Sequence, residues 1–382
     1  MNFIKKLSIV IIALLIPVIL FESYLRIDGR YSSLVSTELY GSNTIWSRYP
    51  SETRYKIHPD KGSNIESKYY EFGAKGKLDF NIDLKNTSVG FFGDSFTENL
   101  RIENRFSFNS FLSELSKDTN LINLGVDGYG TAQSFQRWLN VKDILKLEVV
   151  VYIFCSNDLR NTYEAQIFDR DLFAKGKIKN IVPTDVPLLI ALANSFHITY
   201  LAIEAYFKAK AIYNRVSNLQ TSLYSARLAD KFSSGKEVHR RKFHDEYADK
   251  ILQEFLSDNP SEKTLETAKH FKQIVKKWQE MVEIQGGKFI VAVLPTKEGK
   301  LAAKKLFSNQ EVVQLKSTAE IAQLENLPWK FNIDGHWNEY GNLAAAISLR
   351  DSLNEQEDMN FDPISIDWIE EKRSDIFHYY EN

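Results

Sequence analysis

A short block in the first third of the chain carries a serine that could act as a nucleophile. Gly93-Asp94-Ser95-Phe96 follows the apolar run Ser88 to Phe92, which is typical of a buried strand. A strand that ends in Gly-Asp-Ser and continues into a helix places the serine hydroxyl at the carboxyl edge of a sheet, where open α/β folds bind ligands. The glycine permits a tight turn there. Ser95 is therefore the candidate nucleophile.

A histidine near the other end of the chain supplies a candidate base. Asp334-Gly335-His336 precedes a predicted alanine-rich helix over Leu343 to Leu349. An imidazole can take the proton of a serine hydroxyl, and a carboxylate can orient that imidazole. Ser95, His336 and Asp334 together predict acyl transfer through a serine nucleophile.

Two further blocks follow predicted strands and offer hydrogen-bond donors. Asn123 to Gly130 follows the short strand Leu121 to Leu124, and its glycines allow a backbone N–H to face a ligand. Asn157 follows the continuous apolar strand Val149 to Phe154 and brings an amide side chain. If the strands are parallel, both blocks lie at the same sheet edge as Ser95. Donors of this kind stabilise a developing oxyanion.

The four blocks together resemble those of the SGNH (GDSL-type) hydrolase superfamily, whose name refers to its serine, glycine, asparagine and histidine. The resemblance covers residues 86–160 and 286–352. It implies a three-layer α/β/α sandwich with a flavodoxin-like sheet. The residue pattern agrees, because alternating helices and fully apolar strands over residues 85–158 indicate a parallel sheet covered on both faces.

The resemblance also implies a role for each site residue. Ser95 is the nucleophile, His336 the base and Asp334 its orienter. The oxyanion donors are the backbone N–H groups of Ser95 and Gly128 and the side chain of Asn157. No metal or organic cofactor is implied. In the commonest form of the family the acid lies three residues before the histidine, whereas Asp334 lies two before His336.

The Asp-x-His-Trp-Asn form of the last block resembles branches that act on cell-envelope polysaccharides, including membrane-associated O-acetyl transferases and esterases. An acylated carbohydrate is therefore the expected substrate, and participation in an envelope biosynthesis complex is a further expectation. A lipase or thioesterase acting on lipid acyl esters is one alternative. A non-catalytic envelope assembly or sugar-binding protein is another. Trp337 is consistent with either a sugar-binding surface or simple packing under the loop.

The first thirty residues have the character of an export signal. Lys5 and Lys6 precede the uncharged run Leu7 to Phe21. An uncleaved signal-anchor is the preferred interpretation, with a cleaved signal peptide and a buried core helix as alternatives. It predicts a single-pass protein of the inner (cytoplasmic) membrane whose catalytic domain is extracytoplasmic. Leu188 to Phe207 is also apolar, but its polar residues favour a buried or surface-lying helix over a second span.

The pattern divides the chain into five segments. They are a signal-anchor helix (1–28), a stalk and lead-in (29–84), a catalytic domain (85–160 plus 285–355), a large helical insertion (161–284) and a C-terminal tail (356–382).

Composition excludes several classes of function. The net charge is −2 in 382 residues, so no basic excess argues for binding to nucleic acid. The single cysteine, Cys155, excludes an internal disulfide and a cysteine-rich metal site, and its place after a buried strand predicts a small core residue. His239 and His244 are five residues apart, a spacing that does not place them on one helical face. This spacing argues against a metal site at these two histidines.

Overall fold

The computed structural model describes residues 15–24, 53–75, 86–116, 118–164, 250–308, 310–332, 334–357, 359 and 361–381. The predictions made for Leu188 to Phe207 and for His239 and His244 lie outside these residues, as do most of segment 1–28 and most of the predicted insertion.

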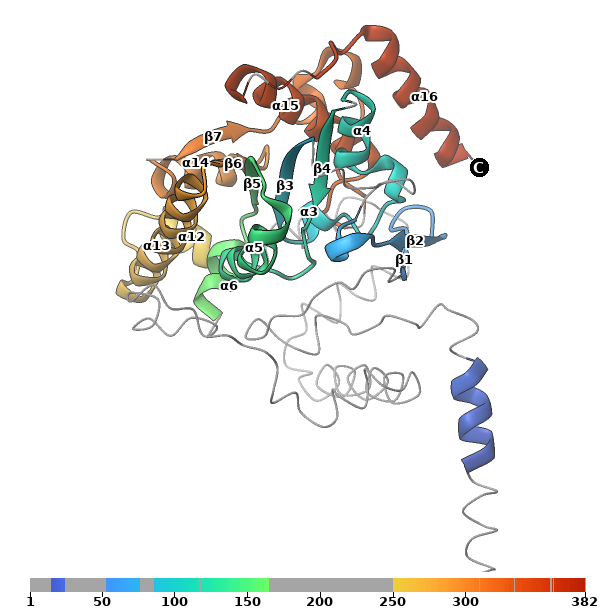
Figure 1. The fold of residues 1–382 in the computed structure, drawn as a ribbon, viewed down its shortest axis with the longest axis horizontal. Helices are drawn as coiled ribbons and strands as arrows, with labels where there is room; N and C mark the ends of the chain where they lie inside the picture. Colours follow the sequence, from blue (N-terminus) through green and yellow to red (C-terminus); the bar gives the residue numbers. More distant parts are fainter. Residues whose placement is uncertain are drawn as a thin grey trace, which may run out of the picture.

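A five-stranded parallel sheet forms the centre of the molecule (Figure 1). Its strands are β3 (Thr87–Gly93), β4 (Thr119–Asn123), β5 (Val149–Phe154), β6 (Lys288–Val293) and β7 (Glu311–Gln314). Their order across the sheet is β4-β3-β5-β6-β7, and every neighbouring pair is parallel. This is the flavodoxin-like order. The predicted fold class is confirmed.

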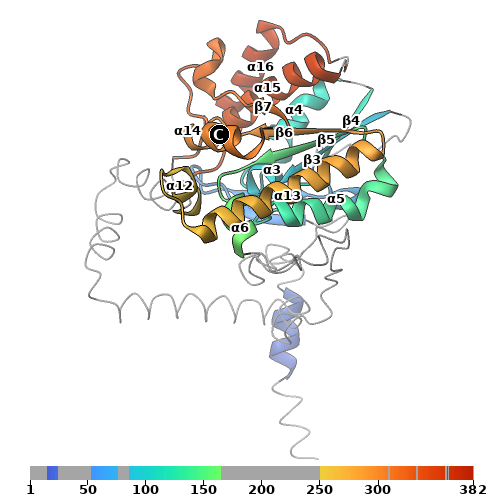
Figure 2. The same cartoon turned by 90° about the vertical axis from the view of Figure 1, so that its left-hand side faces the viewer.

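Helices cover both faces of the sheet (Figure 2). Because successive strand residues point to opposite faces, Val151 and Ile153 of β5 belong to one apolar cluster, and Val150 and Tyr152 to the other. The first face is covered by α4 (Phe108–Glu114), α15 (Glu339–Glu357) and α16 (Ile366–Glu381). The second face is covered by α5 (Thr131–Leu145), α12 (Lys250–Leu256), α13 (Glu262–Ile284) and α14 (Lys297–Leu306).

Two segments that the sequence pattern sets apart from the catalytic domain pack directly into it. Helix α13, assigned to the insertion, lies along α5 and β6, so the residue 284 boundary falls inside the packed domain. Helix α16, assigned to the C-terminal tail, buries Ile369 and Ile376 against the first cluster. Amphipathic spacing reveals such helices in a sequence but not the surface they cover.

Trp278 of α13 is the centre of the second apolar cluster. It is fully buried, and its ring contacts those of Phe92, Phe135, Tyr152 and Phe289 at centroid distances of 5.2–5.6 Å. Side chains from β3, α5, β5 and β6 thus all contact the ring of Trp278.

Replacing Trp278 with alanine is expected to lower the free energy of unfolding by about 3–5 kcal/mol, since the cavity would not close around four rigid rings. Urea unfolding followed by circular dichroism measures this loss. The exposed Lys272 on the same helix provides the control. Its alanine variant should stay within about 0.5 kcal/mol of the parent chain. Equal losses in both variants would contradict a core role for Trp278.

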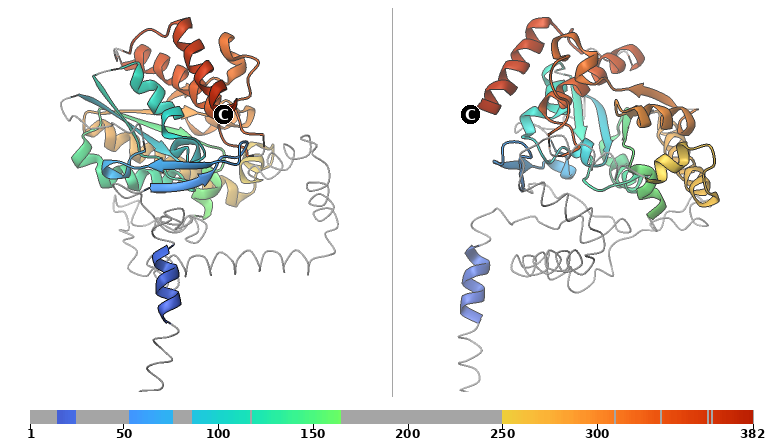
Figure 3. Two further views of the ribbon diagram at one scale, coloured as in Figure 1. Left: turned by 90° about the vertical axis from the view of Figure 1, so that its right-hand side faces the viewer. Right: turned by 180° about the vertical axis from the view of Figure 1, so that it is seen from behind.

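A small hairpin from the lead-in lies beside the main sheet (Figure 3). It consists of the antiparallel strands β1 (Thr53–Ile57) and β2 (Asn64–Lys68). The remaining described helices are short: α3 (Ser95–Glu98), α6 (Asp158–Glu164) and the 3₁₀ turns η1 (Glu71–Gly73), η2 (Asn104–Phe106), η3 (Thr318–Glu320) and η4 (Ala322–Leu324).

Residues 15–24 form a helix whose apolar side chains, Ile16 and Leu20 among them, are exposed. Among the described residues, no helix combines the length and the apolar character that crossing a membrane requires.

Candidate active site

Ser95 lies at the carboxyl end of β3, as its block predicts. Strand β3 ends at Gly93, and α3 begins at Ser95. Gly93 has a φ of +154°, and a Cβ there would lie 2.7 Å from the carbonyl oxygen of Ile153, so the turn requires glycine. The Asp94 carboxylate caps the helix by accepting the N–H of Phe96 at 2.9 Å. The chain runs from β3 to its neighbour β4 on one side and then crosses to β5 on the other side of β3. Ser95, at the end of β3, therefore lies where the strand order reverses direction.

The structure brings Ser95, His336 and Asp334 into one hydrogen-bonded chain. The Ser95 Oγ lies 2.6 Å from Nε2 of His336, although the residues are 241 positions apart. The other ring nitrogen, Nδ1, is hydrogen-bonded to Oδ1 of Asp334. The same carboxylate oxygen accepts the backbone N–H of His336 at 2.9 Å. A two-residue separation therefore suffices for the acid to reach the imidazole.

Asp334 stays ionised in this setting. Burial by itself would raise the pKa of its carboxyl group, but hydrogen bonds from His336 and the positive charge of Arg101 hold the pKa well below its usual range. The guanidinium of Arg101 donates from Nε to Oδ2 of Asp334 at 2.8 Å. Both oxygens of the acid are thus occupied by donors.

The residues assigned to the oxyanion site come from the loops after β4 and β5. Gly128 has a φ of +82°, a conformation that favours glycine. Within the described residues, no protein acceptor is hydrogen-bonded to the backbone N–H of Gly128 or of Ser95. Burial raises the pKa of the Asp94 carboxyl group, and the nearby side chain of Asn157 opposes that rise. The carboxamide of Asn157 has two N–H donors that it can offer to an oxyanion.

Aromatic rings support the histidine. The ring of Phe96, the residue after Ser95, stacks on the imidazole of His336 with centroids 4.8 Å apart. Trp337 is 2% exposed and meets Phe96 edge-on. Trp337 therefore packs under the loop and does not form a surface for sugar.

The loop that carries Asp334 and His336 is held by segments from both ends of the chain. Nδ1 of His58 accepts two backbone N–H groups of its own turn, so its Nε2 carries the proton and donates to Glu339 Oε1 at 3.0 Å. Tyr380 of α16 donates to the other oxygen of Glu339 at 2.6 Å. Glu339 begins α15 directly after the loop, so the hairpin and α16 together fix where the loop ends.

Buried charges lie beneath α3. Lys75 is 1% exposed, and its ammonium group donates to the carbonyl oxygens of Asn99 and Ile102, which follow α3. Burial lowers the pKa of Lys75 to about 7, although the nearby Glu98 opposes that shift. Glu98 is fully buried; its oxygens accept the Tyr69 hydroxyl at 2.6 Å and the Asp127 N–H at 2.5 Å.

The buried lysine predicts a pH-dependent stability. An unfolded lysine keeps its proton up to about pH 10.4, whereas folded Lys75 releases it near pH 7. Between these values the unfolded chain binds more protons, so the contribution of Lys75 to the free energy of unfolding rises with pH by about 1.4 kcal/mol per unit. The penalty for burying the lysine is therefore largest below about pH 7 and is relieved as the pH rises.

The test compares the parent chain with Lys75→Met by urea unfolding from pH 6 to 10. The difference in unfolding free energy should grow in favour of the parent chain above pH 7. Lys276, with a side chain 73% exposed, gives the matched control. Its methionine variant should differ from the parent by a constant amount. A constant difference for Lys75→Met as well would show that the buried lysine keeps an ordinary pKa.

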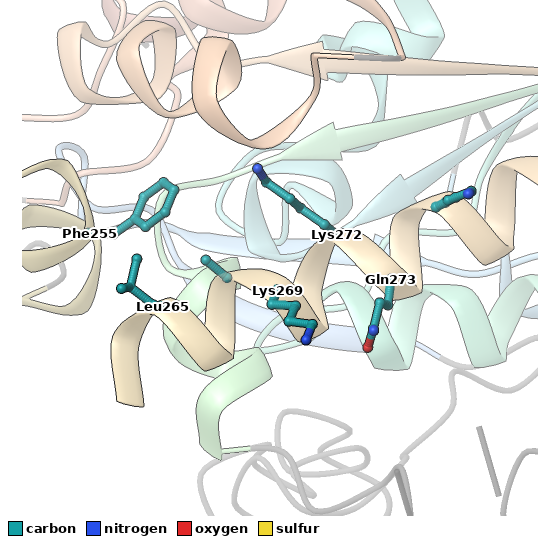
Figure 4. A pocket seen from close by; sticks show the side chains of 7 residues that line it. Phe255, Leu265, Lys269, Lys272 and Gln273 are labelled. Atoms are coloured by element: carbon teal, nitrogen blue, oxygen red, sulfur yellow. The ribbon is translucent and has the colours of Figure 1, made fainter. Parts of the chain in front are cut away.

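A shallow hollow of about 370 Å³ lies on helices α12 and α13 (Figure 4). It is lined by Phe255, Leu265, Ala268, Lys269, Lys272, Gln273 and Lys276. None of these residues belongs to the Ser95 cluster, and none is a histidine, serine or carboxylate. Among the described residues, no group of three or more histidine, cysteine or acidic side chains could hold a metal ion.

Several residues around the site were not found by sequence reasoning. Glu98 and Arg101 follow Ser95 at three-residue intervals, and this regular spacing of charges after the candidate nucleophile was an available signal. Lys75 and His58 carry no comparable signal, because their partners lie far away in the sequence. Cys155, in contrast, is a buried core residue as predicted.

Comparisons with known proteins add little to this geometry. No protein-family model and no curated protein matches the chain. Among solved structures, a member of the lipolytic protein G-D-S-L family from Veillonella parvula DSM 2008 is 11% identical, with a TM-score of 0.34, covering 69% of this chain and 97% of that one.

Two further solved structures give similar values. TesA is 8% identical with a TM-score of 0.35, and the match covers 70% of this chain and 99% of that one. LAE5, an alpha/beta hydrolase enzyme from the metagenome of Lake Arreo in Spain, is 11% identical with a TM-score of 0.32, covering 70% of this chain and 94% of that one. Because these identities and scores are low, the fold rests on the chain's own strand order.

Proposed function

We propose that this protein is a serine esterase or acyltransferase of the SGNH type. The observation that carries the proposal is the chain of hydrogen bonds from Ser95 through His336 to Asp334. A hydroxyl 2.6 Å from a ring nitrogen can lose its proton to that nitrogen, and an ionised carboxylate on the opposite nitrogen stabilises the imidazolium that results.

The reaction proceeds in two half-reactions. His336 Nε2 takes the proton of Ser95, and Oγ attacks the acyl carbon. The oxyanion is stabilised by the N–H groups of Ser95 and Gly128 and by the Asn157 amide. As the ester C–O bond breaks, His336 returns the proton to the leaving alkoxide. Water or a sugar hydroxyl then gives its proton to His336 and attacks the acyl-enzyme, and Ser95 recovers its hydroxyl.

The substrate we propose is an O-acylated envelope or exported polysaccharide with acetyl as the acyl group, and the proposed site of action is outside the cytoplasmic membrane. Two sequence features support this part of the proposal. They are the Asp-x-His-Trp-Asn form of the block around His336 and the lysine-flanked apolar segment at residues 1–28. A membrane-bound enzyme of this kind would work beside other envelope biosynthesis proteins.

The test is the rate of acyl release from three esters by the full-length protein: an O-acetylated polysaccharide, p-nitrophenyl acetate and p-nitrophenyl palmitate. We expect hydrolysis of the two acetyl esters and a much lower kcat/KM for palmitate. Adding a deacetylated polysaccharide as acceptor separates hydrolysis of the acyl-enzyme from transfer. A transferase would move acetyl groups to this polysaccharide, whereas an esterase would release them to water.

Two results would change the proposal. A preference for palmitate would assign the site to lipid esters. Absence of both turnover and covalent labelling of Ser95 by a fluorophosphonate would show that the serine is not activated, and a binding role would replace catalysis.

A further inference from the structure

Arg101 is bonded to one acidic side chain of the site and lies in the electrostatic field of two others. Its Nε donates to Asp334, which lies 233 residues away on the histidine loop. Glu98 on α3 and Asp127 in the loop before Gly128 also act on its charge. Burial opposes the charge of Arg101, but the three carboxylates outweigh burial and raise its pKa. Arg101 therefore stays charged, as arginine ordinarily does in proteins.

The bond from Arg101 gives the second oxygen of the Asp334 carboxylate its hydrogen-bond donor. The histidine loop itself supplies both donors to Oδ1 of Asp334, the ring Nδ1 and the backbone N–H of His336. These bonds fix one oxygen and leave the plane of the carboxylate free to turn. Oδ2 is held by Arg101 at 2.8 Å, and a guanidinium donates along fixed directions. The plane of the carboxylate is thereby set from outside the loop.

We propose that Arg101 is a positioning residue that holds the Asp334 carboxylate in the plane of the His336 imidazole. The proposal rests on the proposed function, in which Asp334 orients the base. Arg101 contacts neither Ser95 nor a substrate in this role; it acts through the acid.

Arg101 also balances the charge around the imidazole. The carboxylates of Asp94 and Asp334 act directly on His336, and those of Asp127 and Glu98 act on Arg101. The guanidinium is the cation bonded to Asp334, and the buried Lys75 also acts on Glu98 and on Arg101. Without the guanidinium, Asp334 would lose its bonded cation, and protonation of the His336 imidazole would be favoured relative to the parent chain. Because a protonated imidazole cannot accept the Ser95 proton, the acid limb of the activity profile should then move to higher pH.

The experiment measures kcat and KM for p-nitrophenyl acetate from pH 5 to 9 in full-length Arg101→Gln and Arg101→Lys variants. For Arg101→Gln we expect kcat to fall about 10- to 100-fold with little change in KM, as for loss of one hydrogen bond to a charged group. The acid limb of the pH–activity profile should move up by about half a pH unit or more, as expected for the loss of one nearby positive charge. Arg101→Lys keeps the charge, so it should keep the acid limb and recover part of kcat.

Two further variants separate positioning from a general structural role. Arg105, whose side chain is 61% exposed and pairs with Glu103, is the matched control, and Arg105→Gln should retain the parent kinetics. In an Asp334→Asn background, Arg101→Gln should cause no further loss, since the acid through which it acts is gone. Equal and additive losses in both backgrounds, or an unmoved acid limb, would overturn the proposal.

A measurement without turnover keeps this inference distinct from the proposed function. The side-chain NMR signals of His336, followed against pH, report protonation of the imidazole whether or not esters are hydrolysed. A parent chain that is inactive and unlabelled at Ser95 would refute the esterase. A His336 titration unchanged by Arg101→Gln would refute the role of Arg101. If Arg101→Gln does not fold, the parent chain is compared with Arg101→Lys. The His336 titration midpoints of these two proteins should agree, while kcat of the variant should fall.

Discussion

Replacing Ser95 with alanine is expected to lower kcat for p-nitrophenyl acetate by about 10⁴- to 10⁶-fold. The hydroxyl that would form the acyl-enzyme is gone, while the donors for the oxyanion remain and leave a small residual rate. The fold should be unchanged, because Ser95 ends a turn that is fixed by Gly93 and by the Asp94 cap. Steady-state kinetics and the thermal unfolding midpoint measure both parts of the prediction.

The chain provides a matched control for this experiment. Ser374 on α16 lies 3.3 Å from Nδ1 of His378, so it is a second serine beside a histidine, but both residues are on the exposed surface. Ser374→Ala should keep the full rate. An active Ser95→Ala protein would exclude Ser95 as the nucleophile, whatever the control shows.

Replacing Asp334 with asparagine is expected to lower kcat by about 10³- to 10⁴-fold, with a smaller effect on KM. Arg101 can only donate, so the carboxamide turns its oxygen toward the guanidinium and its NH₂ toward Nδ1 of His336. Nδ1 must then accept a hydrogen bond, and the ring proton moves to Nε2. That tautomer cannot take the proton of Ser95.

The control is Asp351→Asn, which removes a carboxylate that pairs with Lys316 and Arg350 away from the site. Its kinetics should match those of the parent chain. The NMR signals of His336 test the mechanism directly, since the Asp334 variant should show the Nε2-protonated ring. A loss below about tenfold in kcat would mean that Asp334 is not the orienting group.

Much of the fold follows from local patterns along the chain. The apolar runs ending at Phe92 and Phe154 form β3 and β5, two of the three interior strands, because a strand buried on both faces has few polar positions. Strand β7 was not predicted. It is a four-residue edge strand in which Val313 alone is buried, so its sequence lacks the periodicity of a strand.

The sequence also indicated at which edge of the sheet the candidate site residues would lie. Ser95, Gly128 and Asn157 each follow a strand, and carboxyl ends of parallel strands share one edge of a sheet. Their common edge is therefore a consequence of strand direction, which local periodicity and the helical crossovers already determine. His336 was placed by its resemblance to a known block, and its contact with Ser95 confirms that the two lie together.

Only the tertiary structure decided how these residues are held. The contact of Arg101 with Asp334, the burial of Lys75 under α3 and the bond from His58 to Glu339 join residues 24 to 281 positions apart. Each depends on the direction and packing of side chains between elements, which no local pattern encodes. By itself the sequence determined strands β3 to β6 and the sheet edge at which the candidate reactive groups lie. The geometry that orients these groups arises from packing between distant segments.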